Sequence, residues 1–144
     1  MATILLIVHL LSSLYMFGLI WFVQVVHYPL MAEIEPTNFI SYERQHTLRT
    51  GWVVAPVMLA ELGSGVGLLL TPIWAGLGFQ LLIVSLAALA GVWLSTFLIQ
   101  VPLHQSLSQA YDRHKIKRLV NTNWIRTFLW SLRAAIVVYL VVVL

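Results

Sequence analysis

Four long apolar stretches fill most of this chain of 144 residues and decide where it can fold. They cover about 2–26, 52–71, 78–101 and 123–144, and each is near the roughly 20 residues that an α-helix needs to cross a hydrocarbon core of about 30 Å. Hydrophobic residues make up 60% of the chain and charged residues only 9%, a balance that excludes an ordinary soluble domain. We therefore expect one membrane domain over 1–144, of the all-α class: an integral membrane four-helix antiparallel bundle.

The basic residues are concentrated in two of the three connections. The connection over 71–78 carries no charge, whereas the connections over 27–51 and 102–122 hold six of the eight basic residues. Lys and Arg beside membrane helices stay in the cytoplasm, so both connections should be cytoplasmic and both termini extracytoplasmic. Topology thus accounts for the net charge of +3, and we expect the lipid bilayer, not nucleic acid, as a partner.

The segment before the second membrane helix has an amphipathic pattern. Pro36 is a residue type favoured in the first helical turn, and Phe39, Tyr42, His46 and Arg49 follow at spacings of three and four residues. This spacing predicts a helix with one continuous stripe of these side chains. We expect it to lie at the headgroup level, as an interfacial helix between the first and second membrane helices.

The predicted topology brings four possible metal ligands to the cytoplasmic boundary: His27, Glu43, His46 and His104. Glu43 and His46 are three residues apart, the Glu-x-x-His spacing of metal sites in helical bundles. The chain has no cysteine, which excludes thiolate metal sites and iron–sulfur clusters. Three imidazoles and a carboxylate suit zinc, iron, copper or manganese, and a redox function would require a redox metal such as iron or copper. The alternative is that each histidine only hydrogen-bonds to headgroups or helix ends.

Three further charged residues are candidates for catalysis. Glu61 and Arg133 are the only charges well inside predicted membrane helices, and they lie about 15 Å and 13 Å from the cytoplasmic side. A charge there is costly, so we expect them to pair, either as a clamp between helices or as the polar floor of a substrate pocket. Arg126 is expected at the cytoplasmic entrance, where it binds a lipid phosphate or an anionic substrate. His9 and His114 are expected to lie outside the site.

Several motifs resemble those of the small four-helix bacterial membrane proteins grouped with the fungal anthrone oxygenases. They are His27-Tyr28-Pro29-Leu30, Tyr42-Glu43-Arg44-Gln45-His46, Val101-Pro102-Leu103-His104, and Asn123-Trp124-Ile125-Arg126 through Arg133. The resemblance covers nearly the whole chain, and it implies oxidation of a polycyclic aromatic anthrone by dioxygen and a location in a bacterial inner membrane. By motif, His46 matches the histidine after the family's Tyr-x-x-Gly pattern, with Gln45 in place of the glycine. His104 stands where many relatives have asparagine.

The leading functional hypothesis is a membrane oxidoreductase or oxygenase that uses the His/Glu-bound metal on an apolar substrate. The small haem-containing protoporphyrinogen oxidases are similar in length and architecture, which keeps haem b as an alternative cofactor with His27 or His46 as axial ligand. A non-enzymatic metal carrier or interaction protein is the third hypothesis. The sequence leaves homo-oligomer formation open.

Overall fold

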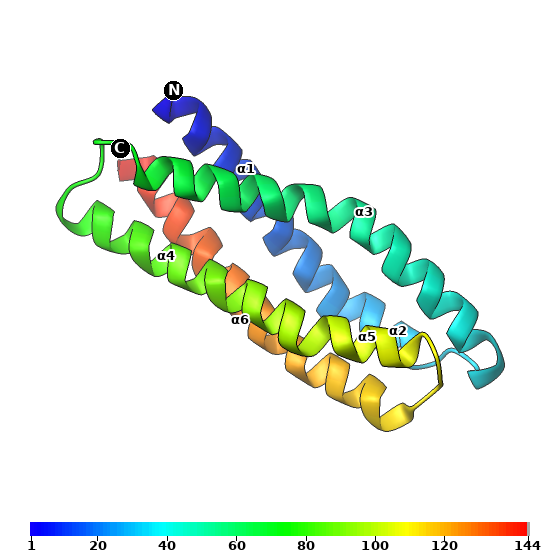
Figure 1. Cartoon of the computed structure of the whole chain (residues 1–144). Helices are drawn as coiled ribbons and strands as arrows, with labels where there is room; N and C mark the ends of the chain where they lie inside the picture. The colour runs from blue at the N-terminus through cyan, green and yellow to red at the C-terminus, as the bar shows by residue number, and fades with distance from the viewer. Residues whose placement is uncertain (144) are drawn as a thin grey trace.

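The computed structural model describes residues 1–143, and within them four long helical rods lie side by side (Figure 1). The first rod is α1 (Ala2–Phe22), η1 (Val23–His27) and α2 (Tyr28–Met31), and the second is α3 (Pro36–Leu69). The third is α4 (Gly76–Ser95), η2 (Thr96–Gln100) and α5 (Val101–Leu107), and the fourth is α6 (Arg113–Val143). All four are long and apolar enough to cross a membrane, which confirms the predicted all-α bundle. Leu144, the predicted end of the fourth helix, lies outside the described residues.

Both chain ends lie at the same end of the bundle as the α3–α4 connection (Figure 1). The connections over 32–35 and 108–112 lie at the opposite end, which also carries most of the basic residues. The rods hold 30 to 34 residues each, so at about 1.5 Å per residue they exceed a hydrocarbon core of about 30 Å. We call the end with the connections over 32–35 and 108–112 the basic end of the bundle.

The segment predicted as a separate interfacial helix is the first part of α3. Pro36 does begin this helix, as expected from its fixed backbone angle. The helix then continues through Pro56 to Leu69 without a break, for 34 residues. The prediction of a separate helix in the headgroup plane was therefore wrong. The polar first part and the apolar second part of α3 differ in hydropathy, but both have the same continuous α-helical backbone.

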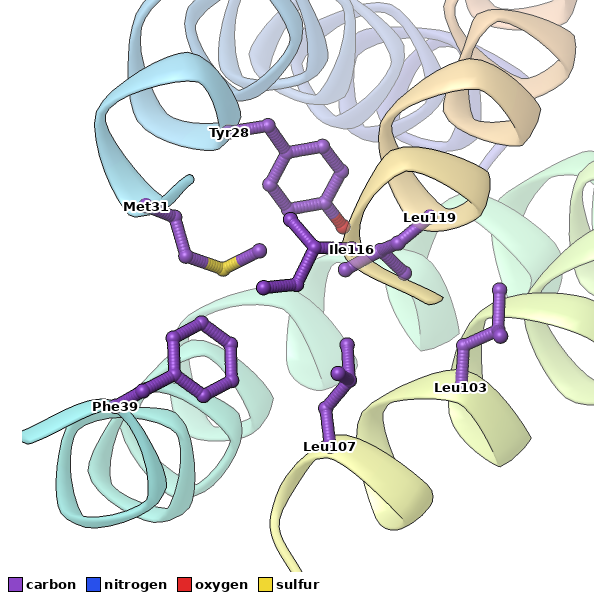
Figure 2. Packing of buried hydrophobic residues seen from close by; sticks show 7 residues of the cluster. All are labelled: Tyr28, Met31, Phe39, Leu103, Leu107, Ile116 and Leu119. Carbon is purple, nitrogen blue, oxygen red and sulfur yellow. The ribbon is translucent and has the colours of Figure 1, made fainter. Parts of the chain in front are cut away.

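At the basic end, α2, α3, α5 and α6 share an apolar core. Figure 2 shows it: Tyr28, Met31, Phe39, Leu103, Leu107, Ile116 and Leu119. This core explains how the rods stay together beyond the hydrocarbon region. The start of α6 is capped by Asp112, whose Oδ1 accepts the backbone N–H groups of His114 and Lys115. The hydrogen bond from the Lys115 N–H is the largest cause of the lowered pKa of the Asp112 carboxyl.

Two rods contain a π-helical turn at matching positions. The backbone N–H of Tyr28 donates to the carbonyl of Val23, and that of Val101 donates to Thr96, each five residues back. In both rods a proline follows, Pro29 or Pro102. Proline has no N–H and its ring collides with the carbonyl four residues earlier, so the wider π turn accommodates it. Both turns lie beside the site described next.

Candidate functional site

The four predicted ligands meet at the basic end of the bundle. The imidazole centroids of His27 and His46 are 4.4 Å apart and stacked, and those of His46 and His104 are 5.5 Å apart. Glu43 is fully buried and accepts a hydrogen bond of 2.5 Å from His104 Nδ1. They come from η1, α3 and α5, so the sequence prediction that distant segments bring these side chains together is confirmed.

Their nitrogen atoms are largely engaged with protein groups. Thr50 Oγ1 lies 3.1 Å from His46 Nδ1, and the Tyr42 hydroxyl lies 3.5 Å from His27 Nε2. Within residues 1–143, no three His, Cys, Asp or Glu side chains are arranged as a metal site. One feature does favour a cation: the second oxygen of Glu43, Oε2, is buried without a hydrogen-bond partner. A metal would have to displace hydrogen bonds of the imidazoles to use this carboxylate.

Glu43 begins a chain of hydrogen bonds that crosses the bundle. His104 Nε2 lies 3.2 Å from the Tyr28 hydroxyl, and Arg126 Nη2 donates to the same hydroxyl over 3.4 Å. Arg126 also donates to Asn123 Oδ1 from Nε and Nη2. With Glu43 ionised, Nδ1 of a neutral His104 carries its proton, so Nε2 accepts from the Tyr28 O–H. The Tyr28 hydroxyl thus lies between His104, to which it donates a hydrogen bond, and Arg126, from which it accepts one.

This chain of hydrogen bonds ends at Gln24, which lies in the first π turn, η1. Asn123 Nδ2 donates to Gln24 Oε1 over 2.7 Å, and Gln24 Nε2 donates to the carbonyl of Val120. Asn123 and Tyr28 are almost completely buried. The sequence analysis missed Tyr28 as a site residue, although its position between His27 and Pro29 was a usable signal. The Gln24–Asn123 contact, between residues far apart in the chain, had no signal in the sequence.

Beside this chain is a cavity of about 450 Å³ between α3 and the α4–η2–α5 rod. Its polar end is lined by Tyr28, His46, His104 and Arg126. The rest is mainly apolar, with Met16, Ile20, Val54, Met58, Trp93, Phe97 and Trp130 among the lining residues. Phe97 is 57% exposed on the outside of the bundle, where lipid tails would lie, so the cavity reaches the surface of the protein. His27 does not line this cavity.

Glu61 and Arg133 form the predicted ion pair, with Arg133 Nη2 2.9 Å from Glu61 Oε1 and both side chains fully buried. Glu61 also accepts hydrogen bonds from Ser13 and from Trp130 Nε1. Arg133 donates to the hydroxyl and the carbonyl of Ser85. Both carboxylate oxygens of Glu61 and all three guanidinium nitrogens of Arg133 thus have a hydrogen-bond partner in the protein.

The expected role of this pair as the floor of the pocket is wrong, because neither side chain lines the cavity. Trp130 links the cavity to the ion pair: this residue lines the cavity, and its indole N–H donates a hydrogen bond to Glu61 Oε2 over 3.1 Å. Glu61 and Arg133 therefore clamp the helices together. Arg126, the third residue predicted as a candidate for catalysis, does line the cavity.

The two histidines excluded from the site lie away from it. His114 is exposed at the start of α6. His9 is buried and its Nδ1 donates to the carbonyl of Glu61 over 3.2 Å, with Ser64 Oγ 3.0 Å away. His9 thus belongs to the Glu61 cluster. This contact between α1 and α3 was not predicted from the sequence, which placed His9 nearer the outer face than Glu61.

Comparison with known proteins adds no relative: no protein-family model matches the chain, and neither does any curated protein or solved structure.

Proposed function

We propose that this protein is a membrane oxidoreductase or oxygenase whose apolar substrate enters the cavity from the bilayer. The observation that carries the proposal is the division of this one cavity. A mainly apolar wall leads to a polar end where Tyr28, His46, His104 and Arg126 face the same space. A volume of about 450 Å³ suits a small molecule, since ligand pockets measure roughly 300–1,000 Å³.

The side chains of the polar end supply acid–base chemistry. Tyr28 is the group that exchanges a proton with the substrate, because its hydroxyl is hydrogen-bonded to His104 and its residue lines the cavity. His104 takes up the proton at Nε2, and Glu43 stabilises the resulting imidazolium through Nδ1. Positioned proton transfer of this kind contributes typically about 10²–10⁴-fold to a rate.

A redox cofactor would complete the reaction. His27 and His46 would supply imidazole ligands to iron or copper, and Glu43 a carboxylate through its unpartnered Oε2. His104 would join them through Nε2 only by giving up its hydrogen bond to Tyr28, so metal binding and proton uptake are alternative roles of His104. Such a metal supplies the one-electron chemistry that the side chains lack. Haem b held by His27 or His46 is the alternative cofactor. The aromatic substrate implied by the family resemblance fits the Trp93, Phe97 and Trp130 side chains of the wall.

The test is to purify the protein in a mild detergent and measure its metal content and visible spectrum. Stoichiometric iron or copper without a Soret band supports the proposed metal, and a Soret band selects haem. His46→Ala and His104→Ala should lose the bound metal, whereas His9→Ala and His114→Ala serve as controls and should keep it. Absence of both metal and haem would overturn the redox assignment and favour an interaction or carrier protein.

A further inference from the structure

The cavity holds one permanently charged side chain, Arg126. Of the Asp, Glu, Lys and Arg residues within 1–143, Arg126 alone lines it. The partners of its guanidinium are neutral groups, the Asn123 amide oxygen and the Tyr28 hydroxyl. The ion pairs in the described part of the chain join other residues.

A cation without a counter-charge at this depth is costly. Arg126 lies about 26 Å from the Val143 end of α6, near the inner limit of a hydrocarbon core of about 30 Å. Arg133, deeper on the same helix, is neutralised by Glu61. Intramembrane charges typically pair with an opposite charge or mark a ligand path. Arg126 Nη1 makes no hydrogen bond to residues 1–143, so one face of the fork is free for a ligand on the cavity side.

We propose that the cavity binds an amphipathic anion: an anionic oxygen headgroup pairs with the Arg126 guanidinium, and an apolar body lies along Met58, Trp93 and Trp130. Arginine suits carboxylate and phosphate oxygens because its N–H groups form a planar fork. The inference deepens the proposed function, since it assigns the substrate of the same cavity to a class. Its headgroup is a free carboxylate, as in a fatty acid, or the phosphate of a lipid.

The experiment uses the full chain in phosphatidylcholine vesicles and two matched quenchers of tryptophan fluorescence, 12-bromododecanoate and 12-bromododecanol. Bromine at the tail quenches Trp93 and Trp130 when the apolar body enters the cavity. We expect saturable quenching by the acid at about 10- to 100-fold lower concentration than by the alcohol, the range for a hydrogen-bonded charge. Arg126→Gln should abolish this preference and Arg126→Lys should restore part of it.

Arg118→Gln is the matched control, because Arg118 is an exposed arginine earlier in α6 that does not line the cavity. It should keep the preference for the acid. Equal quenching by acid and alcohol in the unaltered protein would overturn the proposal even if Arg126→Gln failed to fold. A preference that persists in a folded Arg126→Gln protein would overturn it as well.

Competition then identifies the source of the headgroup. Displacement of 12-bromododecanoate by dodecanoate but not by phosphatidylglycerol supports a free carboxylate, and the reverse result supports a lipid phosphate. The binding assay needs no metal, so its outcome is separate from the metal test. A protein that lacks metal but prefers the acid keeps this inference, and one that holds metal without the preference loses only this inference.

Discussion

Two carboxylates, Glu61 and Glu43, are completely buried, and they differ in how many hydrogen-bond donors surround them. Glu61, in the middle of the bundle, has hydrogen-bond donors from Ser13, Trp130 and Arg133. Glu43, at the basic end, has one donor, His104, and keeps an oxygen without a partner. Glu61 is walled off from the cavity by Trp130, whereas the His104 partner of Glu43 lines it.

The difference separates stability from chemistry. A buried charge with full pairing is held in one arrangement, and removing its partner is strongly destabilising. A buried charge with spare hydrogen-bonding capacity is less stable but can accept a proton or a cation. The exposed fraction does not distinguish these two carboxylates, because it is zero for both. Their partners show that Glu61 belongs to the scaffold and Glu43 to the site.

The largest expected effect is the loss of one partner in the Glu61–Arg133 pair. Glu61→Ala or Arg133→Ala should each lower the free energy of unfolding by about 3–5 kcal/mol, because the remaining charge is left buried. We would measure unfolding by SDS titration in mixed micelles. The double variant with apolar residues should lose less than the sum of the two single variants. Strict additivity would show that the two side chains are not coupled.

A smaller loss is expected from Gly65→Ala, which crowds the same mid-membrane cluster. A Cβ at this position would lie 2.8 Å from Leu86 Cδ2 and 3.0 Å from His9 Cε1. The resulting overpacking should cost about 1–3 kcal/mol in the same SDS titration. Gly63→Ala is the matched control, because a Cβ there meets nothing within 4 Å, so its stability should be unchanged or slightly raised. Equal losses in the two variants would contradict the contact.

The smallest effect on stability is expected at the basic end. Glu43→Gln removes a buried charge that has a single hydrogen bond, so unfolding free energy should change by about 1 kcal/mol or less. The same variant should lose bound metal, because the carboxylate is a proposed ligand. A loss of stability as large as that of Glu61→Ala would place Glu43 in the scaffold and remove the contrast between the two carboxylates.

Much of the fold was predictable because the bilayer imposes few solutions. Four stretches near 20 apolar residues specify four spans, and two charges at equal depth in α3 and α6 specify the Glu61–Arg133 pair. The continuity of α3 was not predictable, since the change in polarity near Gly51 marks the membrane surface and not a helix end. Hydropathy reports the surroundings of a helix, whereas its length depends on backbone hydrogen bonds.

The convergence of the site residues was predictable, but the hydrogen bonds between them were not. His27, His46 and His104 could be brought together because each lies at the end of a predicted span. The hydrogen bonds to Tyr28 and from Asn123 to Gln24 depend on how the helices are rotated about their axes. That rotation is set by packing and by the π turns, neither of which a hydropathy pattern contains.

Each π turn acts as a one-residue insertion that the membrane span absorbs. Residues before Val23 and before Thr96 keep their places in the bundle, whereas everything after them is turned by the extra residue, by about 100° relative to an uninterrupted α-helix. Tyr28 and His104 both lie in the part that is turned. A variant that lacks one residue in each π turn would have rods of nearly the same length but would direct these two side chains elsewhere.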